Sequence, residues 1–302
     1  MTAIDRQDGT GSGARPRRMR SAYPFAFYLP AGLVYGVFFL VPTFASFYFA
    51  LTRWTLFDVS FIGLDNFAQF FREPFLLQGL ANTLVFGLAT SGLKVVLGMA
   101  LAVFLTSAIP LRGLMRSVIF FPVLVSFIGV GIIFTSLMHP SRGAINVALE
   151  VVGIDGPGWL TTPWLAIYSV ILVDVWKGLG IATVILIAGI VSIPQDYYEA
   201  ARIDGATRWQ QFRRVTLPLS RPAIATVIVL SLIGGLRTFD LIWTMTGGGP
   251  GFSSDVVASI IYKQYQAGFY GLSTAGNVVL FVMIALVMLP LVAWMRRRET
   301  EL

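Results

Sequence analysis

The chain is organised around one polar segment, YYEAARIDGATRWQQFRRVTLPLSRP, which covers residues 197–222. Long apolar runs precede and follow it. Pro194 suits the first turn of a helix, because its missing N–H would be unpaired there anyway. Gly205 fits a left-handed C-terminal cap, and Thr207 with Gln210 matches a capping box. The pattern predicts two short helices with a glycine between them.

The second of these short helices has an apolar stripe and a basic back. Trp209, Phe212 and Val215 recur at helical spacing on one face, whereas the neighbouring arginines fall elsewhere. Pro218 and Pro222 are expected to end the segment. A solvated loop, a helix resting on lipid headgroups, a patch packed on its own protein and a surface docked on a partner all fit this pattern.

The same segment resembles the signature of a known transporter family. The matching residues are Glu199-Ala200-Ala201, Asp204-Gly205-Ala206, Phe212, Leu217-Pro218 and Pro222. They look like the EAA motif of permeases from binding-protein-dependent ATP-binding-cassette importers, in which this segment is a coupling helix seated in a groove of a cytoplasmic ATPase subunit. The resemblance implies an ATPase-coupling set, led by Glu199 and Gly205, that comprises Glu199, Ala200, Ala201, Asp204, Gly205, Leu217 and Pro218.

Composition indicates a membrane protein independently of any motif. The chain has 302 residues, of which 56% are hydrophobic and 12% charged, and its mean hydropathy is positive. Apolar surface on this scale is expected to face lipid. There is no cysteine, so disulfides are excluded.

Six apolar segments have the length of a membrane span. About 20 residues cross about 30 Å of hydrocarbon, and the expected spans are residues 25–51, 80–107, 117–137, 164–193, 223–245 and 273–295. The first segment is too long for a secretory signal and no small-residue cleavage site follows it, so a retained helix is expected. Six spans place both termini on one side, and the predicted fold class is an all-α integral membrane protein.

Basic residues in the loops predict the orientation. The side that holds the N-terminus carries Arg6, Arg15, Arg17, Arg18, Arg20, Arg112, Arg116, Arg202, Arg208, Arg213, Arg214, Arg221, Arg296, Arg297 and Arg298. The opposite side carries only Arg53, Arg72, Arg142 and Lys263. Both termini are therefore expected to be cytoplasmic, in a bacterial or archaeal plasma membrane. This asymmetry also explains the net charge of +7 without a nucleic-acid partner.

The predicted organisation has three parts. Residues 1–24 form a disordered basic cytoplasmic tail, residues 25–295 a six-helix permease domain with its coupling loop at 194–222, and residues 296–302 a cytoplasmic C-terminal tail. The resemblance covers nearly everything from Phe25 onward and implies a MetI-like permease fold.

Two loop sequences narrow the resemblance to one branch of the family. FIGLDNF at residues 61–67 and TGGGP at residues 246–250 look like the branch that imports sugars and related polyols. Within that branch they resemble the first of the two unlike permease subunits, of the maltose and glycerol-phosphate type.

Ionisable residues at membrane depth are costly and mark candidate functional sites. Asp174 and Lys177 lie three residues apart on the fourth span, and Arg237 and Asp240 repeat this spacing on the fifth. Lys94 stands alone on the second span. Either each pair neutralises itself and Lys94 reaches a carbonyl or water, or these side chains line a translocation pathway that binds sugar hydroxyls beside aromatic rings.

The resemblance assigns residues to that pathway. The sugar-contacting positions of the maltose-type permease fall at Asp174, Lys177, Gly178, Ser231, Gly235 and Thr238. Arg237 and Asp240 complete the predicted substrate pathway. Several of these positions, Gly235 among them, are not identical to the family's residues, so the same sugar is not implied. The basic residues would suit an anionic substrate, but their Asp neighbours weaken that inference.

The sequence does not contain the residue patterns that metal binding, nucleophilic catalysis or nucleotide binding would require. The sole histidine, His139, adjoins Pro140 at a membrane edge and no carboxylate cluster accompanies it, so no metal site is expected. No base lies near a plausible nucleophile, and no phosphate-binding loop occurs. We therefore expect no catalytic residue and no cofactor on this chain, with ATP and Mg bound by a separate ATPase.

The sequence thus predicts the transmembrane permease subunit of an ATP-driven, binding-protein-dependent importer for a sugar or related polyol. The expected partners are a second, unlike permease subunit, two ATP-binding-cassette ATPase subunits, an extracytoplasmic solute-binding protein and membrane lipid. The main alternative is a secondary transporter driven by an ion gradient, with Asp174, Asp240 or Lys94 as proton or sodium sites. A membrane-embedded enzyme and a structural scaffold are further alternatives.

Overall fold

The computed structural model describes residues 25–55, 57–107 and 109–299. The predicted N-terminal tail at 1–24 lies outside the described residues, as does the end of the C-terminal tail at 300–302. The chain divides into two compact units, and the boundary lies between Ala45 and Ser46.

The first unit is a continuous run of helices. It consists of the 3₁₀-helical turn η1 (Phe25–Tyr28), α1 (Leu29–Tyr35), the π-helical stretch η2 (Gly36–Leu40) and the first part of α2 (Val41–Phe49). Leu29–Phe49 is long and apolar enough to cross a membrane, and none of its most apolar stretch is buried. Such a helix needs lipid or another protein against its side chains.

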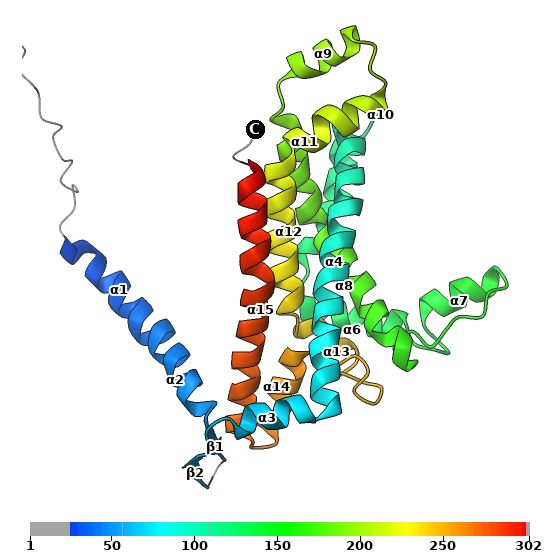
Figure 1. Ribbon diagram of the computed structural model, residues 1–302. Coiled ribbons are helices and arrows are strands. Elements are labelled where there is room, and N and C mark those ends of the chain that lie inside the picture. Colours follow the sequence, from blue (N-terminus) through cyan, green and yellow to red (C-terminus); the bar gives the residue numbers. More distant parts are fainter. Residues whose placement is uncertain (1–24, 56, 108, 300–302) are drawn as a thin grey trace, which may run out of the picture. The chain divides into compact units, whose positions relative to one another are not determined.

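The second unit is built on four long helices that lie side by side. These are α4 (Pro74–Thr106), α8 (Pro163–Val191), α12 (Arg221–Leu236) and α15 (Tyr270–Glu299). α4 packs against both α8 and α12, and α12 also contacts α15 (Figure 1). Pro74, Pro163 and Pro222 lie in the first turns of their helices, where proline costs no hydrogen bond.

The chain bends sharply within the third expected span and just before the fifth. The third consists of α5 (Arg112–Phe120), η3 (Phe121–Leu124) and α6 (Phe127–Leu137), with a bend of 99° before α6. The fifth is preceded by α10 (Arg208–Gln211), the π-helical stretch η4 (Phe212–Thr216) and α11 (Leu217–Leu219), with a bend of 67° before α12. Within the described residues, four helices can cross a membrane, or up to six if each bent pair is one span. This agrees with the predicted six-span fold.

The polar segment ends at a bend that lies between Pro218 and Pro222, the two residues expected to end it. One expectation about the fifth span is wrong. The span itself is not continuous to Met245. α12 ends at Leu236, and a separate helix, α13 (Asp240–Met245), begins only after a three-residue break.

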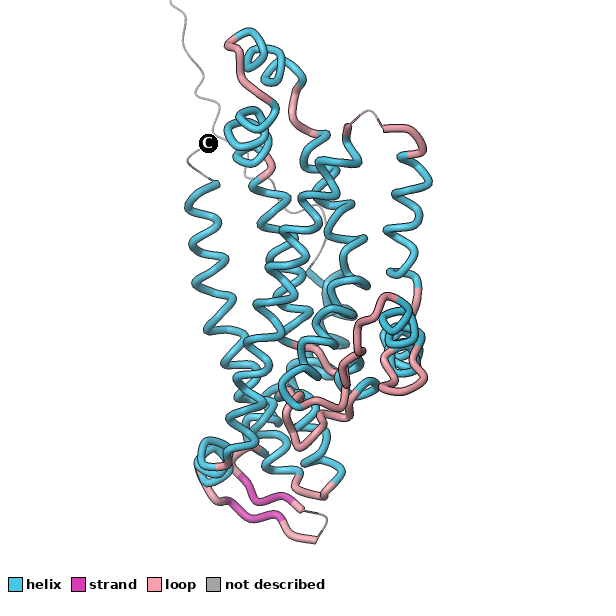
Figure 2. Tube along the Cα trace, turned by 90° about the vertical axis from the view of Figure 1, so that its right-hand side faces the viewer, coloured by secondary structure: helices cyan, strands magenta, loops and turns pink. Residues whose placement is uncertain are grey.

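The two ends of the second unit carry different elements. One end holds α9 (Gln195–Ile203), α10, α11 and the C-terminal end of α15. The other holds the hairpin of β1 (Thr52–Trp54) and β2 (Val59–Phe61), with α3 (Asp65–Arg72) and α14 (Val257–Gln266) (Figures 1 and 2). α7 (Ala144–Val151) projects sideways after α6. The predicted coupling loop and the last span therefore finish at the same end.

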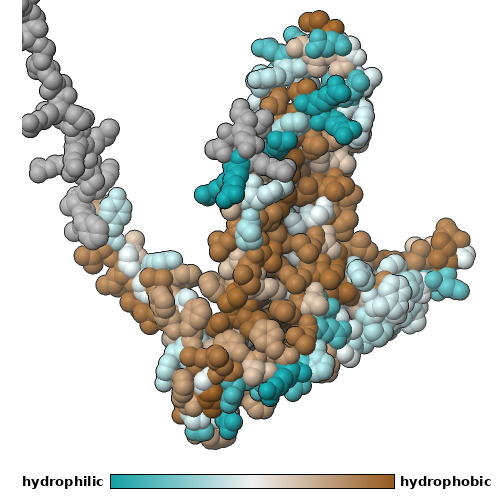
Figure 3. Space-filling model, viewed as in Figure 1, coloured by the Kyte–Doolittle hydropathy of each residue, from teal (hydrophilic) through white to brown (hydrophobic). Residues whose placement is uncertain are grey.

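The side of the second unit is apolar between these ends. Figure 3 shows hydrophobic residues along the helices and hydrophilic residues gathered at the ends. Val96 and Phe104 of α4 and Phe281, Leu286 and Leu289 of α15 are exposed. An apolar band of this extent is expected where helices face lipid.

Candidate functional site

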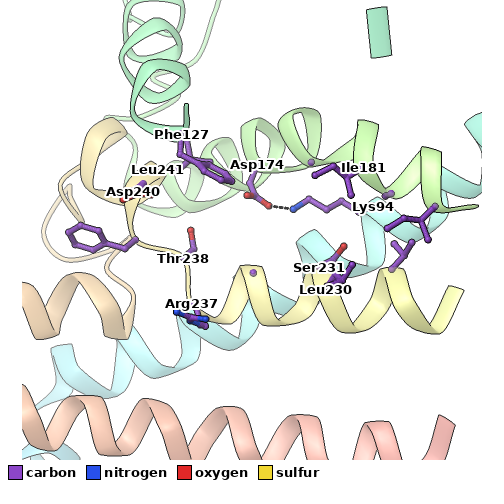
Figure 4. A pocket seen from close by; sticks show the side chains of 16 residues that line it. Lys94, Phe127, Asp174, Ile181, Leu230, Ser231, Arg237, Thr238, Asp240 and Leu241 are labelled. Atoms are coloured by element: carbon purple, nitrogen blue, oxygen red, sulfur yellow. Dashed lines mark hydrogen bonds and ion pairs between the residues drawn. The ribbon is translucent and has the colours of Figure 1, made fainter. Parts of the chain in front are cut away.

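A cavity of about 320 Å³ lies between α4, α8 and α12, at the break that follows α12. Its polar wall consists of Lys94, Asp174, Ser231, Arg237, Thr238 and Asp240. Its apolar wall includes Phe127, Ile181, Leu230 and Leu241 (Figure 4). The cavity thus combines hydrogen-bonding groups of both charges with an aromatic ring, as a site for a hydroxylated solute requires.

An ion pair joins α4 to α8 at the cavity wall. Lys94 Nζ lies 2.5 Å from Asp174 Oδ2, and the side chains are 9% and 8% exposed (Figure 4). A Cβ at Gly178 would lie 2.5 Å from Lys94 Cε, so this glycine makes room for the lysine stem. The partner of Lys94 is thus a carboxylate from another span, and not the carbonyl or water considered from the sequence.

Lys177 lies outside the cavity and does not pair with Asp174. Its Nζ is 3.5 Å from the carbonyl oxygen of Val123 and 4.3 Å from the ring centroid of Phe127. Three residues turn a helix by about 300°, so the two side chains diverge by about 60° around α8. Lys177 therefore binds the bent third span through a carbonyl and a cation–π contact. The self-neutralising pair considered from the sequence does not form.

Arg237 and Asp240 line the cavity without pairing with each other. Within the described residues no ion pair joins them, and both are exposed. Arg237 caps the end of α12, while Phe239 has φ −139° and ψ −57° and precedes α13. The expected pairing assumed a continuous helix, and the break removes that geometry.

Gly235 is a packing residue in this structure. A Cβ there would lie 2.7 Å from Thr90 Oγ1 and 2.8 Å from Gly87 Cα, so the glycine lets α12 approach α4 closely. Of the predicted pathway residues, the cavity brings together Asp174, Gly178, Ser231, Arg237, Thr238 and Asp240, and leaves out Lys177 and Gly235. Phe127 was missed, although Pro122 and the Ser126 cap mark the bend that places it.

The predicted coupling segment forms the expected two helices. Gly205 has φ +74°, the left-handed conformation that glycine adopts without strain. Gln210 N–H donates to Thr207 Oγ1 at 3.3 Å and Thr207 N–H donates to Gln210 Oε1 at 2.7 Å, which confirms the capping box. Glu199 Oε1 lies 3.8 Å from Arg202 Nη2, but both side chains are mostly exposed, so this pair contributes little stability.

One side of the segment is hydrogen-bonded to the rest of the chain, and other side chains of α9 are exposed. Tyr198 Oη lies 3.0 Å from Thr216 Oγ1, and the buried Ser220 hydroxyl donates to the Thr216 carbonyl at 2.7 Å. These bonds connect α9 to the bend that leads into α12. On the other face Tyr197 is 54% exposed and Ile203 is 87% exposed. α9 therefore presents apolar side chains outward while it is fixed to a membrane helix.

The loop at the opposite end is fixed by a buried carboxylate. Asp255 accepts hydrogen bonds from Ser259 Oγ and Lys263 Nζ, each at 2.7 Å, and is 0% exposed. Burial raises the pKa of Asp255, and the hydrogen bonds from Lys263 and Ser259 oppose that rise. Asn82 of α4 donates to the carbonyl oxygens of Ser253 and Asp255, both at 2.8 Å. The glycine-rich loop is thus attached to α4 and α14.

Comparison with known proteins agrees with this architecture. The family described as binding-protein-dependent transport system inner membrane component matches residues 94–299. The trehalose/maltose transport system permease protein of Thermococcus litoralis is 32% identical over 258 residues, which are 85% of this chain and 88% of that protein.

Two solved structures share the fold. A chain of a bacterial ABC transporter that imports the acidic polysaccharide alginate has a TM-score of 0.78 at 27% identity, over 90% of this chain and 94% of its own. A chain of a bacterial alginate ABC transporter in complex with an alginate pentasaccharide-bound periplasmic protein has a TM-score of 0.73 at 26% identity, over 87% and 91%. The likeness thus extends well beyond the EAA segment.

Proposed function

The chain belongs to the family of binding-protein-dependent transport system inner membrane components, and from this premise we propose that it is the permease subunit of an ATP-driven importer for a sugar or related polyol. The similar proteins transport trehalose and maltose in one case and alginate in the other, which supports a carbohydrate. ATP and Mg are bound by a partner chain. The family membership favours this function over a secondary transporter.

The observation that carries the proposal is the construction of α9. Its outward face exposes Tyr197 and Ile203, and its inward face is bonded through Tyr198 to the bend before α12. A partner that holds the outward face can therefore move α12 as a lever. We assign that partner to the ATPase. In the coupling set, Glu199, Ala200, Ala201, Asp204 and Gly205 form the contact, and Leu217 and Pro218 lie beside the bend that passes the movement to α12.

The proposed translocation pathway passes through the cavity at the end of α12. Asp174, Ser231 and Thr238 offer groups that hydrogen-bond to sugar hydroxyls, and Phe127 offers an apolar face. Because the cavity lies where α12 breaks, movement of α12 changes its walls directly. In this mechanism, ATP-driven closure of two ATPases switches the cavity from inward to outward access.

The proposed assembly contains further chains. A second, unlike permease completes the pathway, and a loaded solute-binding protein docks at the end that carries the β-hairpin and α14. The alginate transporter captured with a periplasmic protein supports such a partner. Both termini and α9 face the cytoplasm in this arrangement, as the distribution of arginine and lysine predicts.

Two substitutions in α9 and its cap test the coupling assignment. Glu199→Lys reverses an exposed charge, and Gly205→Val places a branched side chain at φ +74°. In vesicles that contain the complete complex, both are expected to abolish uptake and substrate-stimulated ATP hydrolysis while membrane insertion is retained.

Asp196→Lys is the matched control, because it makes the same charge reversal in the first turn of the same helix. It is expected to keep most of the coupled activity. Normal coupling in both Glu199→Lys and Gly205→Val contradicts the assignment, and uptake without any ATPase present contradicts the proposed function.

A further inference from the structure

A second concave surface lies on the outside of the bundle, between α4 and the segment that follows α9. This groove of about 590 Å³ is lined along α4 by Val95, Val96, Met99, Ala100 and Val103, and at its end by Arg208, Trp209, Phe212, Leu217 and Ile224. We propose that the groove binds an anionic phospholipid, with an acyl chain along α4 and the phosphate at Arg208.

The groove faces away from the translocation cavity. Val96 follows Lys94 by two residues, which places the two side chains about 200° apart around α4. Lys94 lines the cavity, whereas Val96 is 66% exposed in the groove. The groove is therefore continuous with the apolar side of the bundle, where lipid is the expected neighbour.

The rim of the groove has the chemistry of a membrane–water boundary. Trp209 is 66% exposed and lies 5.4 Å from Phe212, measured between ring centroids. Tryptophan is enriched where apolar helices meet water, because its ring is apolar and its N–H is polar. This places a lipid headgroup beside Arg208, the residue before Trp209.

The charge of the rim selects the headgroup. Arg208 is exposed, and within the described residues its guanidinium has no hydrogen bond or ion pair. No acidic residue lines the groove. A guanidinium binds phosphate oxygens through parallel hydrogen bonds. Without a carboxylate to attract a choline group, the rim favours a net-negative headgroup over a zwitterionic one.

Quenching of Trp209 fluorescence in lipid nanodiscs tests the proposal, first on the full chain alone and then on the assembled complex. The contribution of Trp209 is the difference between the wild-type chain and Trp209→Phe. Phosphatidylglycerol and phosphatidylcholine with brominated acyl chains are compared at equal bromine content. We expect phosphatidylglycerol to be preferred about fivefold, the effect of one favourable charge near the membrane surface.

Two variants locate the effect. Arg208→Gln is expected to abolish the preference for phosphatidylglycerol and to leave quenching by phosphatidylcholine unchanged. Ala100→Phe, which fills the groove from α4, is expected to reduce quenching by both lipids. Arg213→Gln removes an equal charge from the same segment at a residue that does not line the groove, so the preference should remain.

Three results would overturn the proposal. The first is equal quenching by the two lipids in the wild-type chain. The second is an equal loss of the preference for phosphatidylglycerol in Arg208→Gln and Arg213→Gln. That result would mean that the general surface charge of the segment, and not the groove, attracts the anionic lipid. The third is no quenching of Trp209 by either lipid in the assembled complex, which would mean that a partner protein covers the groove.

Discussion

The ion pair between Lys94 and Asp174 determines how charge is presented in the cavity. Both side chains are nearly buried, and a charge at this depth is tolerated chiefly when it is paired. The pair also connects two spans that are distant in sequence. A solute that binds Asp174 therefore meets a carboxylate already neutralised by an amine, which suits an uncharged hydroxylated molecule.

Removal of Lys94 is expected to destabilise the chain strongly. Lys94→Met leaves the buried Asp174 carboxylate without its ion-pair partner, at a cost of about 3–5 kcal/mol. Lys177→Met should cost much less, because that amine holds only a carbonyl at 3.5 Å and a ring face. Thermal unfolding of the two variants in detergent measures the difference.

A double substitution separates pairing from lost packing. In Lys94→Met with Asp174→Asn no charge remains to be neutralised, so most of the lost stability should return. Transport need not return with it, because Asp174 lines the cavity. Equal destabilisation by the single and the double variant would mean that the lysine acts through its stem.

Sequence patterns predicted which residues belong near the cavity better than how they pair. Asp174, Arg237 and Asp240 were identified because charges are rare in apolar spans, and all three line the cavity. Their pairing was not predictable, because spacing along one helix contains no information about a neighbouring helix. Lys94 is the clearest case, since its partner is 80 residues away.

At the scale of helices, the contact between α4 and α12 depends on small residues. The glycine at 235 brings α12 against Gly87 and Thr90. Close approach through small residues is a common way to associate helices in a membrane, where lipid tails are as apolar as leucine. This contact fixes the end of α12 that forms the cavity.

Gly235→Ala is expected to destabilise the bundle by about 1–3 kcal/mol, because its Cβ would meet the backbone of α4 at 2.8 Å. Gly234→Ala is the matched control, since a Cβ at that position meets nothing within 4 Å. Unfolding of both variants in detergent measures this difference. Equal stability of the two variants would contradict a close contact between α4 and α12 at Gly235.

The loop between α13 and α14 should make stability depend on pH. Burial raises the pKa of Asp255 above its ordinary 3.8. The folded state then keeps a proton that the unfolded state has lost, so the stabilisation is complete below the unfolded pKa and is lost as pH rises through the folded pKa. We therefore expect wild type to lose stability relative to Asp255→Asn between acid and neutral pH. A constant difference across that range would contradict the raised pKa.

Apolar length predicted the spans, but not their bends. Each predicted span contains a helix, because about 20 apolar residues can satisfy their backbone in lipid only as a helix. The 99° bend before α6 and the break between α12 and α13 were not predicted. Pro122 and the Ser126 cap mark the first interruption, and Arg237 and Thr238 mark the second. Hydropathy averaged over the length of a span does not register such single residues.

At the scale of the whole chain, the proposed function gives the two ends different partners. The end with α9 presents exposed apolar and basic side chains, and the end with the β-hairpin is built from short elements fixed by buried polar residues such as Asn66 and Asp255. In the proposed importer the first end receives the ATPase and the second receives the solute-binding protein. This division holds only if the two ends face opposite sides of the membrane.

Single cysteines test that orientation directly, because the natural chain contains none. Asp58→Cys lies in the β-hairpin and Asp204→Cys follows α9, so both replace an exposed aspartate, at opposite ends of the second unit (Figure 1). The chain is expressed without an ATPase, which would cover Asp204. A membrane-impermeant maleimide is then expected to label Asp58→Cys in intact cells and Asp204→Cys only in inverted vesicles. Arg112→Cys, at the start of α5, should behave like Asp204→Cys if the third span crosses the membrane. Labelling of Asp204→Cys in intact cells would reverse the orientation, and ATP in the cytoplasm could then not act through α9.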